Sequence, residues 1–179
     1  MLTWLKRKRD NRRTARSLYG SIVTQSRQGA LYADWGVPDT AEGRFEMLVL
    51  HLVLAMRRLS QAADEDLQRT LTETFAVDID DAMREMTVGD LAVPRHVKRA
   101  VAVLHDRHTH YGKGLDSADP GLLAGAVSTR LGGLKGSEGL DTAAICAYLR
   151  EATLVLAATP VGKLFEGRID WPHPGQPER

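Results

Sequence analysis

Residues 39–59, DTAEGRFEMLVLHLVLAMRRL, surround the longest apolar run of the chain, Met47 to Met56. Asp39 with Glu42 three residues later is typical of a capping box, so a helix is predicted to begin here. Apolar side chains then occupy every side of this helix. The pattern indicates either a central helix that is covered on most sides or a helix that lines a binding groove.

Helical periodicity continues on both sides of this stretch. Apolar residues in steps of three and four, with capping residues, predict further helices over 10–28, 64–86, 94–112, 119–131 and 141–159. Gly112 and Gly114 are expected to end the helix that starts at Pro94. No stretch alternates strictly between apolar and polar residues, as a half-buried strand would. The sequence predicts an all-α, single-domain bundle of about six helices over 17–160, with a basic arm over 1–16 and an extended C-terminal tail over 161–179.

Composition narrows the class of protein. With 43% hydrophobic and 26% charged residues, the chain has the balance of an ordinary globular domain, which argues against global disorder. His51 interrupts the longest apolar run, and no run approaches the roughly 18 residues of a membrane-spanning helix. The single cysteine, Cys146, cannot form an internal disulfide, and this suits a reducing compartment.

The net charge of +1 is unevenly distributed. Residues 1–16 carry seven basic side chains and one acid, so this arm is +6 and the rest of the chain is −5. Apolar residues precede the charges, the reverse of a secretory signal, which predicts a mature cytosolic protein. Such an arm suits anionic lipid or rRNA, and its removal is expected to leave the fold intact. The residues expected to contact membrane or ribosome are Trp4, Lys6, Arg7, Lys8, Arg9, Arg12 and Arg13.

Two histidine features were candidates for ligand chemistry. Residues 105–110, HDRHTH, hold three histidines, but their spacing matches no established zinc pattern and has no cysteine partner. Solvated histidines are favoured there. His51 could in principle ligate haem iron, although a core histidine with satisfied hydrogen bonds is the favoured interpretation. We therefore predict neither a metal nor a cofactor.

Catalytic and nucleic-acid signatures are scarce. No nucleophile elbow, glycine-rich phosphate loop after a strand, or HExxH motif occurs. The sequence therefore predicts that the protein is not an enzyme. The basic residues of the helix after Pro94 are expected to face solvent: Arg95, Lys98, Arg99 and Arg107. They lack the interleaved aromatic residues that stack on single-stranded RNA, and no DNA partner is predicted. Attraction to phosphate backbones or lipid headgroups stays open.

Four blocks carry a family pattern, in order along about residues 18–171. The first, residues 18–59, holds Leu18-Tyr19, Tyr32, the Pro38-Asp39-Thr40 helix start and Leu50-His51. The others are FAVDIDDAMREMTVGDL over 75–91, YGKGL over 111–115 and EGRIDW over 166–171. In these blocks the chain resembles the ubiquinol–cytochrome c chaperone family. It departs from the pattern at 104–108, LHDRH, where an aromatic-rich stretch is expected.

The resemblance implies a helical, non-enzymatic assembly factor. Its partner would be newly made cytochrome b, the haem-bearing membrane subunit of ubiquinol–cytochrome c reductase, held until it joins the other subunits. In a bacterium this implies a peripheral location at the cytoplasmic face of the inner membrane. A groove formed partly by the Phe45–Met56 helix could shield an apolar client segment. The residues expected to contact the partner are Asp39, Arg44, Phe45, Met47, His51, Met56, Gly89, Asp90 and Tyr111.

Other functions remain open from the sequence alone. A ribosome- or RNA-associated translation regulator would use the basic arm and would show steep salt dependence of RNA binding. A haem-handling protein would use His51 or the 105–110 histidines. A lipid-modifying or hydrolytic enzyme is the least favoured, because no paired nucleophile and base is located. The oligomeric state also stays open, since a second copy could cover the apolar helix.

Overall fold

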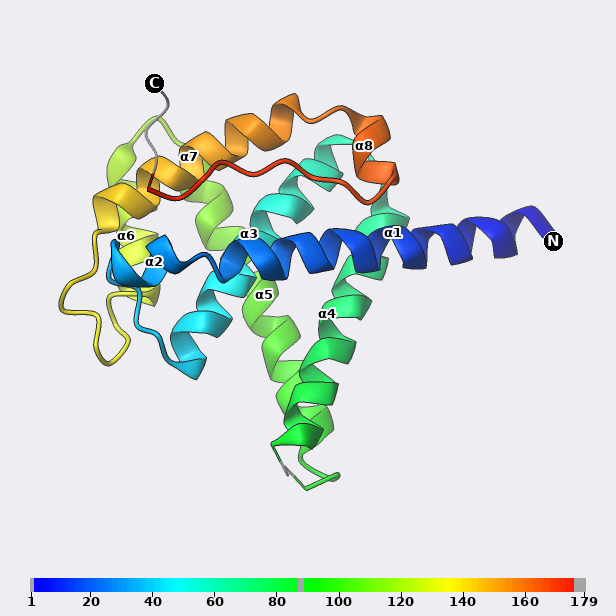
Figure 1. Cartoon of the computed structure of the whole chain (residues 1–179), viewed down its shortest axis with the longest axis horizontal. Helices are drawn as coiled ribbons and strands as arrows, with labels where there is room; N and C mark the ends of the chain where they lie inside the picture. The colour runs from blue at the N-terminus through cyan, green and yellow to red at the C-terminus, as the bar shows by residue number, and fades with distance from the viewer. Residues whose placement is uncertain (1, 87–88, 176–179) are drawn as a thin grey trace.

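The structure is a computed structural model that describes residues 2–86 and 89–175, with side chains from residue 9 onward. The described residues form helices and no strand, which confirms the all-α prediction (Figure 1). None of the helices in the described part of the chain combines the length and the continuous apolar character that spanning a membrane requires. In chain order the helices are α1 (Leu2–Ser26), α2 (Gly29–Ala33), α3 (Ala41–Gln61), α4 (Glu65–Glu85), α5 (Val93–Asp116), α6 (Pro120–Arg130), α7 (Thr142–Ala158) and α8 (Val161–Phe165).

Helix α3 lies at the centre of the bundle and packs against α1, α4, α5 and α7. Every residue from Val49 to Met56 is buried. The central-helix interpretation of the all-round apolar pattern is therefore right. The capping prediction needs one correction. Thr40, rather than Asp39, caps the helix, because its hydroxyl oxygen accepts a hydrogen bond of 3.1 Å from the Gly43 amide.

Aspartates cap three further helices, and the sequence predicts two of these caps, Asp119 and Asp141. Their side chains accept hydrogen bonds from backbone amides of the first turn: Asp64 from Leu67 at 2.8 Å, Asp119 from Gly121 at 2.8 Å and Asp141 from Ala144 at 2.9 Å. These bonds satisfy donors that have no partner inside the helix. At the other end of α7, Arg58 of α3 donates to the carbonyls of Leu156 and Thr159, at 2.7 and 2.8 Å. Arg58 thus joins the two helices.

Helix α5 extends beyond its predicted end. Gly112 and Gly114 lie inside the helix, which continues to Asp116. A Cβ atom at Gly114 would lie 2.7 Å from the Leu123 Cα of α6, and one at Gly112 would lie 2.8 Å from an Arg57 guanidinium nitrogen of α3. Both glycines allow neighbouring groups to approach α5 closely. Close packing, rather than helix termination, explains them.

The chain after α7 does not simply extend away from the bundle. It forms the short helix α8, and residues 166–175 then run along α1 (Figure 1). Four polar side chains on one stripe of α1 hold this C-terminal segment, because positions three and four apart share a helix face. The four hydrogen bonds are Thr14 to the Phe165 carbonyl at 2.9 Å, Ser17 to the Gly167 carbonyl at 2.9 Å, Trp171 Nε1 to the Ser21 hydroxyl at 3.0 Å and Gln25 to the Pro172 carbonyl at 2.8 Å.

Candidate partner-binding site

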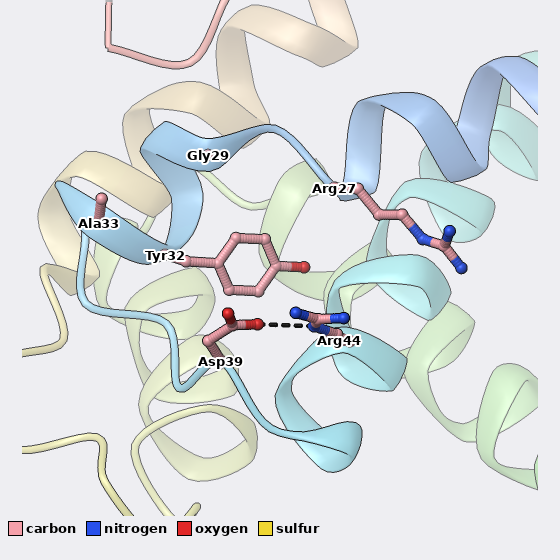
Figure 2. Close-up of a pocket in the computed structure, with 6 residues that line it drawn as sticks. All are labelled: Arg27, Gly29, Tyr32, Ala33, Asp39 and Arg44. Carbon is pink, nitrogen blue, oxygen red and sulfur yellow. Dashed lines mark hydrogen bonds and ion pairs between the residues drawn. The ribbon is translucent and has the colours of Figure 1, made fainter.

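An open pocket of about 460 Å³ lies between the end of α1, α2 and the start of α3 (Figure 2). The short helix α2 is fixed to the bundle behind it, since the Asp141 amide donates a hydrogen bond of 2.9 Å to the Trp35 carbonyl just after α2. The buried side chain of Leu31 anchors its inner face. The lining residues are Arg27, Gly29, Tyr32, Ala33, Asp39 and Arg44.

An ion pair forms one wall of the pocket. The Arg44 Nε atom donates to Asp39 Oδ1 at 2.6 Å, and this hydrogen bond lowers the pKa of Asp39 below its usual value. Both side chains are more than half exposed, so solvent screens the attraction between them. The ion pair therefore contributes little to the stability of the fold. Its two side chains are held in place at the surface, where a partner can reach them.

Tyr32 and Arg27 complete the pocket. The Tyr32 hydroxyl donates to the Ser26 carbonyl at 2.7 Å, and its ring lies beside the Asp39–Arg44 pair (Figure 2). Burial raises the pKa of Tyr32, which keeps the phenol protonated as a donor. The exposed Arg27 guanidinium has no ion pair within the described part of the chain. With two guanidinium groups and one carboxylate, the pocket suits carboxylate and carbonyl oxygens of a peptide.

The structure separates the predicted partner-contacting residues into three groups. Asp39 and Arg44 come together in the pocket, and the half-buried Phe45 follows them, with its ring centroid 6.4 Å from that of Phe75. The other predicted residues of α3 and α5 are in the core and cannot contact a partner in this conformation. They are Met47, His51, Met56 and Tyr111, none of them more than 8% exposed.

The remaining predicted residues lie away from the pocket. Gly89 and Asp90 are exposed where α4 leads into α5, and Asp90 accepts a hydrogen bond of 2.8 Å from Arg84. The basic arm is the first half of α1 rather than a separate segment, and Arg9, Arg12 and Arg13 are exposed on it. The predicted contacts of four other arm residues fall outside the described side chains: Trp4, Lys6, Arg7 and Lys8.

His51 is a satisfied core histidine, as favoured from the sequence. Its Nδ1 lies 2.7 Å from the Met47 carbonyl, which can only accept, so Nδ1 carries the proton. Its Nε2 accepts from the Tyr148 hydroxyl at 2.7 Å, and Gln25 donates to that hydroxyl at 3.0 Å. Complete burial lowers the pKa of His51 to about 4. With both ring nitrogens engaged, His51 has no free atom for haem iron in this conformation.

A buried ion pair joins α3 and α5, and one of its members does not lie where the sequence predicts it. Arg107, expected to face solvent, donates to both oxygens of Glu46, at 2.9 and 2.6 Å, and each side chain is about one-tenth exposed. This hydrogen-bonded pair raises the pKa of Arg107. The partners are 61 residues apart, so no local spacing could have indicated the contact.

The pair also explains part of the 105–110 histidine segment. Asp106 accepts from Arg107 at 2.5 Å and lies 3.1 Å from Arg130 and 3.2 Å from His110. A carboxylate among these donors acts as a junction between α5 and α6. Across the part of the chain that the structure describes, no three His, Cys, Asp or Glu side chains converge in a way that could hold a metal ion.

A second open pocket, of about 400 Å³, lies between α5 and α6. Small residues of α6 line most of one side, and Leu122 is 54% exposed there. Small side chains allow another backbone to approach closely. No local sequence pattern indicates this pocket, because it depends on how α6 packs on Gly114. Its lining residues are His110, Lys113, Gly114, Gly121, Leu122, Gly125, Ala126, Thr129 and Arg130.

Comparison with known proteins supports one family. The profile of the family described as Ubiquinol-cytochrome C chaperone matches residues 33–171. Among solved structures, the crystal structure of the Cbp3 homolog from Brucella abortus is similar with a TM-score of 0.82 and 30% sequence identity, covering 99% of this chain and 100% of that one. No curated protein matches the chain. Because the profile spans well over half of the sequence and the fold agrees over its whole length, this chain belongs to the ubiquinol–cytochrome c chaperone family.

Proposed function

We propose that this protein is an assembly chaperone of ubiquinol–cytochrome c reductase that binds newly made cytochrome b. The observation that carries the proposal is the family match over residues 33–171, which the structural similarity to the Cbp3 homolog supports. Family membership favours a non-enzymatic role. In this role the protein acts by covering exposed surface of its client, without making or breaking a bond.

The client contacts the surface rather than the centre of the bundle, because Met47, His51 and Met56 of α3 are covered. The pocket beside Arg27 and Arg44 binds a polar connecting segment of the client. Such segments carry backbone carbonyls and acidic side chains, which match guanidinium donors in both charge and geometry. Tyr32 adds an amphipathic ring of the kind enriched in protein interfaces.

The α5–α6 pocket binds an apolar part of the client. Its lining combines Leu122 with small residues of α6, so a client helix could lie close against it. A membrane-protein segment that waits for its partners exposes apolar side chains, which favour burial against such a surface. The two pockets thus serve the polar connections and the apolar faces of one client.

Recovery of cytochrome b with the tagged protein tests the proposal. The tagged chain is purified from mildly solubilised membranes of its own cells, and cytochrome b is quantified in the eluate. We expect Arg27→Glu to lower the recovery severalfold, whereas Lys135→Glu, which makes the same charge change in an exposed loop, leaves it unchanged. Leu122→Glu is expected to lower recovery, and Leu154→Glu on exposed α7 surface serves as its control.

The same experiment separates the competing functions. If the eluate contains ribosomal RNA and no cytochrome b, and recovery falls steeply with salt, the protein acts as a translation regulator rather than a client-holding chaperone. If cytochrome b is recovered but both pocket variants retain it fully, the family function stands and the client surface lies elsewhere.

The place of action is the cytoplasmic face of the bacterial inner membrane, where cytochrome b is inserted. The exposed arginines of the arm, Arg9, Arg12 and Arg13, provide attraction to anionic lipid in this proposal. Binding of the purified protein to anionic vesicles, and its loss when these charges are removed, tests the location independently of the client.

A further inference from the structure

The α4–α5 hairpin projects from the bundle (Figure 1). Two large apolar side chains near its tip are exposed. Leu91 is 99% exposed and Met86 is 66% exposed. They are two of the three most exposed large apolar side chains among the described residues, the third being Leu154 of α7 at 71%. Single exposed apolar residues are ordinary, but two at one projecting tip indicate a contact surface.

Basic side chains adjoin this tip on one face of α5. Arg95, Lys98 and Arg99 are exposed, and their spacing of three and four residues places them on the same side of the helix. None of them forms an ion pair within the described residues. Arg84 of α4 differs, because it is engaged by Asp80 at 2.6 Å and Asp90 at 2.8 Å.

We infer that this tip is a membrane-docking surface for an anionic bilayer. Leu91 and Met86 enter the headgroup region, while Arg95, Lys98 and Arg99 bind lipid phosphates. Apolar residues that insert beside basic residues that attract anionic lipid are the combination used by proteins that lie on a membrane. The inference concerns a surface separate from the two client pockets and does not depend on the proposed client.

The size of the apolar surface favours a bilayer over a protein partner. A stable protein interface buries roughly 800 Å² on each side around a packed apolar centre, which two side chains cannot form. A bilayer requires no shape complementarity and accepts one or two inserted side chains. RNA is a poorer match, because Leu91 and Met86 would gain no burial against phosphates and the surface has no aromatic residue for stacking.

Acidic residues on the neighbouring helix weaken the electrostatic attraction of the tip to anionic lipid. Asp81 and Glu85 of α4 are exposed close to the tip and oppose binding to anionic lipid. The electrostatic attraction of this surface to anionic lipid is therefore weak on its own. Insertion of the apolar side chains is needed as well for the protein to bind the bilayer. Two weak signals that act together are typical of reversible membrane association.

Vesicle partitioning of the full-length protein tests the inference. The probes are vesicles of phosphatidylcholine with and without about one-third phosphatidylglycerol, and the readout is the partition coefficient from flotation. Met86→Ser with Leu91→Ser should lower binding to anionic vesicles about tenfold, and the control pair Leu154→Ser with Val161→Ser, both exposed and outside the tip and the two pockets, should change it less than twofold. Each charge removed in Arg95→Gln, Lys98→Gln and Arg99→Gln should cost roughly fivefold.

A gain-of-signal variant reports insertion directly. Leu91→Trp should show a blue-shifted emission, relative to wild type, and quenching by brominated lipid when anionic vesicles are added. Equal vesicle binding by the wild type and by both tip variants overturns the inference, even if the arm binds lipid. Binding that needs the three charges but not the apolar pair, and that RNA competes away, also overturns it and assigns the surface to a polyanion. Neither result affects the client proposal, which is measured by recovery of cytochrome b.

Discussion

The Tyr148 hydroxyl donates a hydrogen bond of 2.7 Å to Nε2 of His51 and so joins α7 to the central helix inside the core. Gln25 of α1 donates both to this hydroxyl, at 3.0 Å, and to the Pro172 carbonyl, at 2.8 Å. One chain of hydrogen bonds therefore connects three helices and the C-terminal segment. Buried polar groups that are fully paired in this way favour a single packing arrangement over alternatives.

The buried neutral His51 makes stability depend on pH. Its pKa is about 4 in the folded protein and about 6.5 in the unfolded chain, so the unfolded state takes up a proton first as the pH falls. Stability is full above pH 6.5 and declines toward pH 4, by roughly 3 kcal/mol. Urea unfolding at several pH values measures this decline. His51→Gln should be less stable at pH 7.5 and should lose most of the dependence, with the remainder from His108, whose pKa burial also lowers.

The Glu46–Arg107 pair should respond differently to single and double substitution. Arg107→Leu leaves the buried Glu46 carboxylate without a partner and should lower the free energy of unfolding by about 3 kcal/mol. Glu46→Leu should cost less, because Arg107 keeps its hydrogen bond to Asp106. The double variant should recover much of the loss, because no unpaired charge remains. A double-mutant cycle by chemical denaturation measures the coupling. Additive losses would show that the two side chains do not stabilise the fold as a pair.

Gly167 should be required for docking of the C-terminal segment. It has a φ of +77°, and a Cβ atom there would lie 2.6 Å from the Ser17 Cβ of α1. Gly167→Ala should therefore cost about 2 kcal/mol and increase hydrogen exchange over residues 161–175. The matched control is Gly162→Ala in α8, where a Cβ would meet no atom within 4 Å. Equal stability and exchange in the two variants would contradict the docking described above.

The basic arm should bind anionic vesicles through side chains rather than as a removable segment. Thr14 and Ala15 are buried, so deletion of residues 1–16 would remove part of the core, and the expected neutrality of that deletion has to be revised. Arg12→Gln with Arg13→Gln should lower vesicle binding at least tenfold without altering thermal unfolding. Lys113→Gln with Lys135→Gln removes the same charge elsewhere and should leave binding nearly unchanged. Equal losses in both variants would indicate a general charge effect rather than an arm contact.

The fold follows from local patterns more completely than the site does. Helix positions and the caps at Asp119 and Asp141 depend on neighbouring residues, and the sequence predicts them. The extent of α5 cannot be predicted in this way, because Gly112 and Gly114 are placed by contacts with Arg57 and Leu123. The docked C-terminal segment was also missed, since its stripe of partners on α1 lies about 150 residues away and the segment has no periodicity of its own.

The residues of the candidate site also differ in whether local sequence or packing decides their position. Asp39 and Arg44 are five residues apart at a helix start, inside the first block of the family resemblance, so that block already places them close together. Met47 and Met56 were assigned to a groove because an all-round apolar helix has the same sequence pattern whether it is central or lines a groove. Only the packing of α1, α4, α5 and α7 around α3 decides between these alternatives.

A pulse-labelling experiment tests the central claim that this chaperone binds newly made cytochrome b. Cells that carry the tagged protein are labelled briefly and chased, and labelled cytochrome b is measured in the purified complex over time. We predict that labelled cytochrome b co-purifies directly after the pulse and disappears during the chase as it enters the assembled reductase. Recovery of folded, tagged protein without labelled cytochrome b at any time would contradict the account.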